Sequence, residues 1–430
     1  MLKIGIVGAG VLGISLAYWL SNLTDHEVYL IEKEKTPAYH STARNTGVIH
    51  TPFFIPPEAK EVTQSWINSY EAWVETASIF HQPAKVNGQL EVAMNEDDIK
   101  TLELHKKWAK DNGLNEDEIL LLDKNELKRF SEELSSTFGL FSKKEINVNF
   151  KNLVKSIYEN FLKNNVKSIF NFQLKSLYEK SGLIYLQGWS ENHEIEINLD
   201  FLINATGNNS LNIYKMLGHN IEYSEIRVKA TYYRISDDCP SINTNVFTVP
   251  KYPKFPFLDP HYILRPDNTK DIGPTISIVY KPFGYDEKFM VSLFNILLNS
   301  DFKDIKNYNT LFIKEGLIKI LIKDGFRIYF KNSMKKFFSK VFPPLLKCDI
   351  FPKDPGIMHY LLNDKGIMQK TVIKETENTL HILNYDAPGA TGAPYYSFTV
   401  VKDLINKGIL KRINNTEIKM WKSIVDKFYF

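Results

Sequence analysis

Three glycines near the start of the chain have the spacing that nucleotide-binding turns require. Gly8, Gly10 and Gly13 form a G-x-G-x-x-G pattern, and Glu32 follows nineteen residues after the last of them. In such a motif one glycine makes a tight turn, one admits a pyrophosphate close to the backbone, and one lets a helix approach a strand. The helix N-terminus then faces the phosphates, and the acid accepts hydrogen bonds from a ribose. The pattern therefore predicts a dinucleotide site.

The elements that must hold these glycines are visible around them. Residues 2–7 are apolar apart from Lys3 and predict a buried strand, residues 11–23 have the apolar spacing of a helix, and residues 28–31 predict a second strand. Residues 4–24 contain no charged side chain and are long enough to cross a bilayer. The glycines, and the lack of a cleavage site before Asp25, favour a strand–turn–helix–strand unit over a membrane anchor or a secretion signal.

Two later segments are predicted to return to the same site. Residues 201–205 form an apolar strand that closes on an A-x-G turn, as in flavoproteins with two dinucleotide-binding stretches. An ordinary strand with a glycine turn is the alternative interpretation. Residues 380–383 predict another strand, and a loop over residues 387–394 leads from it into a helix whose first backbone amides suit another part of a flavin. The residues predicted to bind from these two segments are Ala205, Gly207, Gly389, Ala390, Thr391 and Gly392.

The composition excludes several classes of function. At 430 residues, with 43% hydrophobic and 24% charged residues, the chain is long enough for two ordinary globular domains. A net charge of +3, without a basic block interleaved with aromatics, argues against a nucleic-acid partner. Cys239 and Cys348 are the only cysteines and lie far apart in sequence, which excludes a cysteine metal site and indicates a reducing, cytoplasmic compartment. The histidines lack metal-ligand spacing, so no metal is expected.

A series of short motifs resembles one enzyme family. Residues 32–54, EKEKTPAYHSTARNTGVIHTPFF, match that family's glutamate, lysine and R-N-S-G-V-I-H stretch. The motifs NGQLEVAM, PFLDPH, Gly273-Pro274, Gly284-Tyr285 and APGATGAP follow in the family's order. By these residues the chain resembles the FAD-dependent oxidoreductases of the D-amino-acid oxidase type, and within them most closely L-2-hydroxyglutarate oxidase/dehydrogenase. The resemblance covers nearly the whole chain, and the order and spacing of the motifs make it specific.

The resemblance and the separated nucleotide segments imply an α/β fold, α+β overall. We expect a Rossmann-like FAD domain of the two-dinucleotide-binding type, assembled from residues 1–75, 146–216 and 346–430. An interleaved substrate domain with an antiparallel sheet is expected from residues 76–145 and 217–345. The two insertions would form a cap over the nucleotide domain.

The resemblance also implies redox chemistry without a metal. FAD would take the C2 hydrogen of a small 2-hydroxy acid as hydride at its N5, while a base on the protein takes the hydroxyl proton. Non-covalent binding of FAD is expected, because relatives that tether the flavin through a histidine have it where Arg44 stands here. The residues expected by family position to hold FAD are Gly8, Gly10, Gly13, Glu32, Lys33, Ser41, Thr42, Arg44, Asn45 and Gly47.

Three residues are predicted to be catalytic, namely His50, His261 and Lys229. The two histidines match family histidines near the flavin, and each can serve as the proton acceptor or as the partner of a substrate carboxylate. Packing in the pocket wall is the alternative role for each histidine. Lys229 stands for an arginine in the family's F-R-G-E-Y strand, which is VKATYY here.

The family's G-V-R-A-Q stretch departs most from its pattern. It is GIMHY here, so that Met358, His359 and Tyr360 are the predicted substrate residues and Met358 replaces the arginine. A guanidinium binds a carboxylate through two parallel hydrogen bonds, which methionine cannot form. We therefore expect a substrate with fewer carboxylates, or a bulkier and less charged tail, than L-2-hydroxyglutarate. His359 is a candidate replacement for the lost charge.

Other functions remain open on the same scaffold. An amine or amino-acid oxidase would act on a substrate nitrogen in place of oxygen. A sugar-acid oxidase and a flavin-binding protein without turnover are the remaining alternatives. The expected electron acceptor is oxygen or a membrane quinone.

One basic segment indicates a membrane surface. Residues 314–347 combine lysine and arginine with isoleucine, leucine and phenylalanine, as interfacial segments do. This composition indicates a peripheral contact with the inner face of a membrane. An ordinary helical cap on the substrate domain is the alternative.

Overall fold

The glycine motif follows the first strand of a six-stranded sheet. The structure is a computed structural model that describes residues 1–430 apart from 192, 256, 386–388, 414–416 and 429–430, and apart from the side chains of 326 and 327. The strand order is β21-β22-β13-β1-β2-β9, in which β21 is antiparallel to its neighbour and the other strands are parallel. These strands are β1 (Lys3–Val7), β2 (Glu27–Ile31), β9 (Lys167–Ile169), β13 (Phe201–Asn204), β21 (Val372–Glu375) and β22 (Thr379–Asn384).

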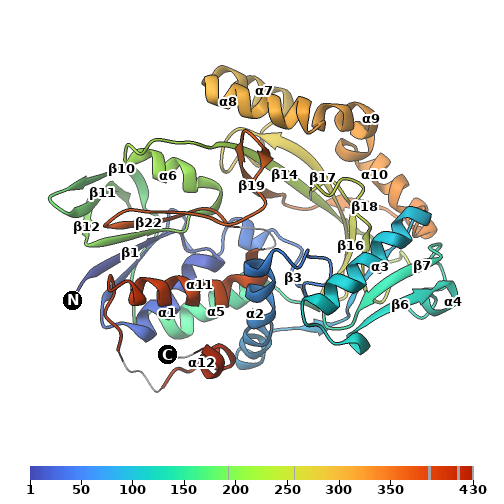
Figure 1. Ribbon diagram of the computed structural model, residues 1–430, viewed down its shortest axis with the longest axis horizontal. Coiled ribbons are helices and arrows are strands. Elements are labelled where there is room, and N and C mark those ends of the chain that lie inside the picture. The colour runs from blue at the N-terminus through green and yellow to red at the C-terminus, as the bar shows by residue number, and fades with distance from the viewer. Residues whose placement is uncertain (192, 256, 386–388, 414–416, 429–430) are drawn as a thin grey trace.

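Helices cover one face of this sheet (Figure 1). Trp19 in the first helix donates from Nε1 to the carbonyl of Pro394 at 2.8 Å. Trp19, Trp73 and Trp421 are fully buried in one cluster, so residues from both ends of the sequence share a core. The helices are α1 (Val11–Leu23), α2 (Lys60–Ile79), α5 (Phe150–Ile157), which continues as a π-helix over Tyr158–Leu162, α11 (Gly389–Asn406) and α12 (Lys422–Phe428).

The opposite face packs against a small antiparallel sheet and a short helix. Leu186, Leu199 and Ile213 from these elements are buried with Val7 and Leu202 of the six-stranded sheet. Because both faces are covered, β1 and β13 are apolar along almost their whole length. The covering elements are β10 (Gln173–Lys180), β11 (Leu183–Ser190), β12 (His193–Leu199) and α6 (Ser210–Met216).

A ten-stranded sheet forms the other half of the molecule (Figure 1). Its order is β20-β19-β14-β17-β16-β15-β5-β7-β6, with β18 paired to β14 beside this path. Among the described residues its pairs are antiparallel except for β15 with β5. The strands are β5 (Gln89–Val92), β6 (Ile119–Asp123), β7 (Phe138–Ser142), β14 (Ser224–Ile235), β15 (Asn245–Thr248), β16 (His261–Leu264), β17 (Lys270–Val279), β18 (Ile350–Pro352), β19 (Gly356–Asn363) and β20 (Gly366–Ile367).

Further elements join the two halves or cover the large sheet. Ile226 and Val228 of β14 and Ile276 of β17 are buried against Leu311 and Leu317 of the helical segment that follows. A three-stranded sheet of β3 (Val48–Ile49), β8 (Ile146–Asn147) and β4 (Lys85–Val86) lies between the halves. The helices are α3 (Glu96–Asp111), α4 (Lys124–Leu127), α7 (Phe289–Leu298), α8 (Phe302–Asn309), a π-helix over Thr310–Lys314, α9 (Leu317–Tyr329) and α10 (Lys331–Phe338).

The α/β fold expected from the sequence is confirmed. Strands of the six-stranded sheet fall within the three expected FAD-domain ranges. However, β18, β19 and β20 lie in the ten-stranded sheet, although the expected range 346–430 gives them to the FAD domain. β18 and β19 each pair with β14, and β20 pairs with β19. The chain returns to the six-stranded sheet only at β21.

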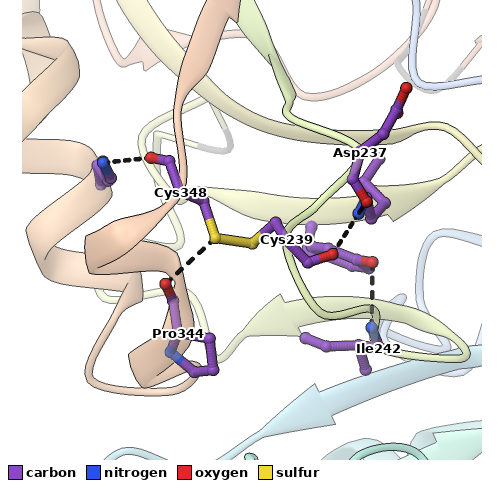
Figure 2. Close-up of a disulfide and its surroundings, with 8 residues drawn as sticks. Asp237, Cys239, Ile242, Pro344 and Cys348 are labelled. Atoms are coloured by element: carbon purple, nitrogen blue, oxygen red, sulfur yellow. Dashed lines mark hydrogen bonds between the residues drawn. A yellow bond between two sulfur atoms is a disulfide. The ribbon is translucent and has the colours of Figure 1, made fainter.

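The two cysteines are joined, which corrects the expectation drawn from their separation in sequence. Cys239 and Cys348 form a disulfide with a Cα–Cα distance of 5.4 Å across 109 residues of chain (Figure 2). Lys270 donates to the carbonyl of Cys239, and Lys335 donates to the carbonyl of Cys348. Distance along the chain says little about distance in a mixed sheet. Because disulfides are typical of oxidising compartments, the cysteines no longer support a reducing one.

Helix α1 approaches strand β1 as closely as its glycines allow. A Cβ added to Gly13 would lie 1.8 Å from the carbonyl oxygen of Gly8. Gly8 itself has φ +105°, and a Cβ there would lie 2.6 Å from the carbonyl oxygen of Ala205. Both positions therefore require glycine, one for helix–strand contact and one for the turn.

Protein purified without a reductant should contain no free thiol. Alkylation under denaturing conditions, followed by mass measurement, should show no addition before reduction and two additions after it. Reduction should lower the free energy of unfolding by about 2–4 kcal/mol, because the bond closes a long loop in the unfolded chain. Two thiols before reduction would contradict the pairing.

Gly13→Ala should destabilise the protein and weaken FAD binding. The added methyl must push α1 from β1, an overpacking that costs about 1–3 kcal/mol and moves the helix N-terminus. Gly325→Ala is the matched control, because a Cβ there would meet only Tyr329, at 3.9 Å in helix α9. That change should stabilise the chain by about 0.5–1 kcal/mol. Denaturant unfolding and flavin titration measure both variants, and equal behaviour of the two would refute the packing argument.

Candidate active site

The residues expected to bind FAD lie where the parallel strands end. Gly8 follows β1, Glu32 follows β2, Ala205 follows β13, and Gly389 begins the helix after β22. The carboxyl ends of parallel strands share one edge of a sheet, where open α/β folds bind their ligands. The backbone N–H of Gly8 donates to Ile31 at 2.8 Å, which fixes the turn against the second strand. The structure therefore brings three distant segments to one edge.

Glu32 occupies the end of β2 within reach of the glycine turn. Its Oε2 accepts from the N–H of Ala9 at 2.7 Å, and its Oε1 accepts from the N–H of Glu34 at 2.9 Å. Burial raises the pKa of the Glu32 carboxyl, although these amides oppose the shift. Lys33 pairs with Glu34 and lies 3.9 Å from the ring centroid of Phe283. Glu32 is thus held against the glycine turn, while Lys33 contacts Glu34 and Phe283.

The loop after β2 crosses the N-terminus of α1. Thr42 Oγ1 accepts from the N–H of Val11 at 3.0 Å, one of the amides that a helix leaves without an internal partner. Asn45 Oδ1 accepts from the N–H of Gly47 at 2.9 Å, and Gly47 has φ +75°. Ser41 Oγ donates to a backbone carbonyl of β19 at 3.0 Å. These predicted cofactor residues lie together around the helix N-terminus.

Lys229 and Arg44 both contact the 285–287 loop, which forms a cluster separate from His50 and His261. Lys229 Nζ donates to the carbonyls of Tyr285, at 2.9 Å, and Glu287, at 2.7 Å. The Arg44 guanidinium lies 4.2 Å from the Tyr285 ring centroid, and His40 Nδ1 is 2.9 Å from the Tyr285 hydroxyl. Burial lowers the pKa of Lys229. These bonds tie Lys229 to the 285–287 loop and not to the predicted catalytic histidines.

His50 lies beside a buried carboxylate that the sequence analysis missed. Its Nδ1 is 3.5 Å from Oε2 of Glu145, which is 0% exposed. The other oxygen of Glu145 accepts from the backbone N–H of Thr51 at 2.9 Å and from its hydroxyl at 2.7 Å. Among the described residues, His50 Nδ1 and Glu145 Oε2 have no hydrogen-bond partner. The imidazole and the carboxylate therefore lie side by side without a hydrogen bond between them, close enough for the charge of one to act on the other.

The cofactor segments reach this pair through the start of α11. The backbone N–H of His50 donates to Thr391 Oγ1 at 3.3 Å, and Thr391 Oγ1 donates to the carbonyl of Val48 at 3.3 Å. The His50 ring is tilted against Trp66 at 5.7 Å between centroids. Part of the predicted loop 387–394 lies outside the described residues, but Gly389 to Gly392 are within α11.

His261 begins β16 and lies near His50 across a shared aromatic ring. The ring of Phe247 stacks on His261 at 4.0 Å and stands edge-on to His50 at 6.0 Å between centroids. Burial, together with the charge of His50, lowers the pKa of His261 to about 3. His261 is therefore neutral near pH 7, which makes it a weak base and a poor ionic partner for a carboxylate. It pairs with Gly273, whose peptide bond to Pro274 is cis.

The predicted substrate residues do not share one face. In β19, Met358 and Tyr360 point to one side and His359 to the other, as successive residues of a strand must. The Tyr360 hydroxyl lies 3.6 Å from Met358 Sδ, and both side chains pack in the cluster beneath the helical segment. His359 Nε2 lies 3.0 Å from Glu225 Oε2. Met358 and His359 therefore have different surroundings, and His359 already has an ionic partner.

A buried carboxylate links the large sheet to the cofactor loop. Asp271 is 0% exposed and accepts from Arg234 at 2.8 Å, Arg265 at 2.7 Å and Lys353 at 2.6 Å. Burial alone would raise the pKa of Asp271, but these cations lower it below its usual value. Arg265 also donates to the backbone of Asn45 at 3.2 Å. Strand β16 is thereby fixed against the loop at the α1 N-terminus.

Comparison with known proteins places the chain in a class defined by this fold and site. The fold is that of an enzyme that binds a dinucleotide at the end of a parallel sheet beneath a second sheet. The family model described as FAD dependent oxidoreductase matches residues 3–395. The chain belongs to the FAD-dependent oxidoreductase family, and it is an FAD-dependent enzyme.

Curated relatives and solved structures agree with this membership. The chain is 22% identical over 394 residues to L-2-hydroxyglutarate dehydrogenase of Indibacter alkaliphilus, covering 90% of this chain and 95% of that protein. It is 23% identical over 402 residues to the Escherichia coli K12 protein of the same name, covering 90% and 89%. The structure of FAD-bound L-alpha-glycerophosphate oxidase from Mycoplasma pneumoniae is similar with a TM-score of 0.72 at 19% identity, covering 97% and 98%. Glycine oxidase from Geobacillus kaustophilus has a TM-score of 0.66 at 13% identity, covering 95% of each chain.

The residues present fit FAD. The glycines at positions 8 and 13 are required by their close contacts, and Glu32 is hydrogen-bonded to the turn between them, as a dinucleotide-binding turn with its acidic residue requires. Buried polar atoms of His50, Glu145 and His261 have no hydrogen-bond partner among the described residues, and both histidines contact the Phe247 ring. Within the described ranges, no group of three or more histidine, cysteine, aspartate or glutamate residues is arranged to hold a metal ion.

Glu145→Gln should slow flavin reduction without removing FAD. The amide keeps the size of the side chain but not the charge that stabilises a protonated imidazole, so we expect a fall of about 10²–10⁴-fold, the usual contribution of general-base catalysis. Glu91→Gln is the matched control, because Glu91 is also buried and pairs at 2.7 Å with His105, outside the site. Stopped-flow reduction without oxygen measures both. An equal loss in the two variants would show a structural role only.

Proposed function

We propose that this flavoenzyme oxidises the CH–OH group of a small 2-hydroxy acid resembling L-2-hydroxyglutarate. The observation that carries the proposal is the buried His50–Glu145 pair beside the start of α11. Curated relatives across 90% of the chain are named for this hydroxy acid, which supports a hydroxyl substrate. At 22–23% identity these relatives do not determine which 2-hydroxy acid is the substrate, so we infer the acid from the side chains predicted to contact it.

Proton transfer from the substrate hydroxyl is assigned to His50. Bound FAD supplies the acceptor for the hydride that leaves C2. His50 accepts the hydroxyl proton, and Glu145 holds the ring and offsets the positive charge that it gains. The N–H of Thr51 and its hydroxyl keep the Glu145 carboxylate in place through its other oxygen.

His261 and Lys229 have lesser roles in this proposal. A pKa of about 3 leaves His261 neutral, so it orients the hydroxyl or the carboxylate by hydrogen bonding. Lys229 holds the 285–287 loop near Arg44 and acts on the substrate only through that loop. Of the two predicted histidines, His50 is therefore the base.

Met358 shapes the preference for the substrate tail. Its sulfur contacts the Tyr360 hydroxyl in apolar surroundings, where a second carboxylate would lose its hydration without gaining a fork of hydrogen bonds. Charge-assisted hydrogen bonds contribute roughly 1.5–3 kcal/mol each. We therefore propose a monocarboxylic or less charged 2-hydroxy acid.

Oxidation of a CH–NH group is the second candidate. It is favoured by structural similarity to glycine oxidase and to L-amino acid deaminase from Proteus vulgaris, which has a TM-score of 0.66 at 16% identity, covering 98% of this chain and 96% of that chain. Such similarity shows the fold alone. Release of ammonia during turnover separates this activity from the oxidation of a hydroxy acid.

The surroundings of the enzyme complete the proposal. We propose oxygen or a membrane quinone as the electron acceptor and a peripheral contact with a membrane surface. The disulfide is the observation that argues against a reducing compartment.

FAD should leave the protein on acid precipitation, because Arg44 cannot form the histidyl bond of the tethered relatives.

Met358→Arg should improve the use of dicarboxylic substrates. A screen of flavin bleaching without oxygen, over hydroxy acids, amino acids and sugar acids, should show fastest reduction of the unaltered protein by a monocarboxylic 2-hydroxy acid. The new guanidinium should raise the affinity for L-2-hydroxyglutarate at least about tenfold, since one charged hydrogen bond contributes roughly 1.5–3 kcal/mol.

Met358→Leu is the control for that change, because it keeps the volume without adding charge. It should leave the order of preference unchanged. Rapid reduction of the unaltered protein by micromolar L-2-hydroxyglutarate would overturn the assignment of the pocket. Bleaching by amino acids alone, with ammonia release, would replace the proposed reaction by the second candidate.

A further inference from the structure

A helical arm lies along the outside of the ten-stranded sheet (Figure 1). The arm, residues 289–329, consists of α7, α8, the π-helix over Thr310–Lys314, and α9. Its inner side chains, such as Leu311 and Leu317, are buried against the sheet. No helix among the described residues is long and apolar enough to cross a membrane.

The outer face of α7 is apolar and open to solvent. Met290 is 70% exposed, Phe294 is 62% exposed and Leu298 is 66% exposed. Their spacing of four residues places them on one face, opposite the buried Ser292. A helix that is apolar all round is normally buried on all sides. Helix α7 is covered on one side only.

The apolar surface continues along the arm. Phe302 is 86% exposed in α8, and Ile322 is 79% exposed in α9. Scattered single apolar residues are normal on a soluble protein, but a run of them over three helices marks an interaction site. The remaining question is which partner covers it.

The acidic residues of the arm are already paired. Asp301 and Asp304 lie 3.9 and 3.5 Å from Lys303. Glu315 pairs with Lys254 of the body at 2.8 Å, and Asp324 pairs with Lys251 at 2.8 Å. Each acidic residue of the arm therefore has a lysine within 4 Å, and two of the four pairs, those with Lys251 and Lys254, are in direct contact.

Four lysines of the arm are left with their charge open. Lys306, Lys314, Lys319 and Lys323 are exposed, and none forms an ion pair with any other residue that the structure describes. Lys319 and Lys323 directly follow the exposed Ile318 and Ile322 in α9. Exposed lysines without an ion-pair partner among the described residues are therefore neighbours of exposed apolar side chains in α9.

This combination favours an anionic lipid surface over a second copy of the chain. A symmetric dimer through the arm would bring the lysines of both copies together, which like charges oppose. A membrane accepts both features, because apolar side chains enter the acyl boundary while lysines reach anionic headgroups. Each lysine near such a surface strengthens binding several-fold.

We propose that the arm is the docking surface of the protein for an anionic membrane. The sequence places the contact in residues 314–347, and the structure moves it toward α7. Much of the second half of that segment is core, because Met334, Phe338 and Phe342 are buried with the ten-stranded sheet. The surface is separate from the His50–Glu145 pair, so membrane docking and the proposed chemistry can be tested apart.

Sedimentation with vesicles tests the docking surface. The full chain with FAD bound should sediment with vesicles of mixed phosphatidylcholine and phosphatidylglycerol at low salt, less at high salt, and little with phosphatidylcholine alone. Lys319→Gln with Lys323→Gln should weaken binding about thirtyfold. Phe294→Ser with Phe302→Ser should weaken it at least about tenfold, through lost apolar burial.

Matched changes elsewhere control for charge and apolar content. Lys107→Gln with Lys151→Gln removes the same charge from exposed positions outside the arm, and Val86→Ser removes a side chain that is 65% exposed. Both controls should bind vesicles like the unaltered chain. Flavin absorbance and the rate of anaerobic flavin reduction should stay unchanged in every variant, which shows that the fold and the chemistry are intact.

Three outcomes would overturn the proposal. The protein could stay in the supernatant with both kinds of vesicle, or the control variants could lose as much binding as the arm variants. The third is a dimer in solution that Phe294→Ser with Phe302→Ser dissociates, without vesicle binding by the unaltered chain, which would assign the surface to a second copy. In all three cases flavin reduction reports separately on the proposed function.

Discussion

The contact between Gly13 and the carbonyl of Gly8 is the constraint on which the site depends. With no Cβ in the way, α1 lies close enough to β1 for Trp19 to reach the Pro394 carbonyl of α11. The start of α11 then lies against β3, where Thr391 accepts from the backbone of His50. A single close approach between helix and strand is thus linked through α11 to both the glycine turn and the backbone of His50.

Two buried carboxylates serve this arrangement in different ways. Asp271 has three cations around it and joins the large sheet to the cofactor loop. Removing one partner of such a buried pair costs about 3–5 kcal/mol, because a charge is left unpaired. Glu145 has one histidine near it and an oxygen without a hydrogen bond. The first carboxylate has its charge paired within the protein, whereas the second keeps an oxygen without a hydrogen bond beside His50, which is why we propose that it offsets the charge gained there.

The sequence carries a clearer local signal for the predicted cofactor residues than for the predicted substrate residues. Local rules determine Gly8, Gly10, Gly13 and Glu32, because turn, helix start and strand end are encoded within thirty residues. No local sequence rule identifies Glu145, because it meets His50 only when the turn before β8 folds against β3. The disulfide was hidden for the same reason, because it joins two loops that lie 109 residues apart in sequence, and such a contact leaves no trace in spacing.

The substrate residues show where resemblance to a family reaches its limit. Motif position groups Met358, His359 and Tyr360, but the alternation of a strand separates them into two surroundings. Register with β14 decides which face each side chain meets, and register is set by long-range pairing. The exposed arm was likewise located only in part, because basic and apolar composition does not tell which helix face is covered.

The bond between Trp19 and Pro394 also has a consequence for the time course of synthesis. The two residues are 375 positions apart. At about 5–20 residues per second, the ribosome needs about 20–75 s to make the chain between them. During that interval α1 lacks the helix that covers it, and the turn at Gly8 lacks the segment that completes the cleft. Loading with FAD must therefore follow synthesis of α11, and a nascent chain that stops before it would present an apolar helix to chaperones instead of a flavin to substrate.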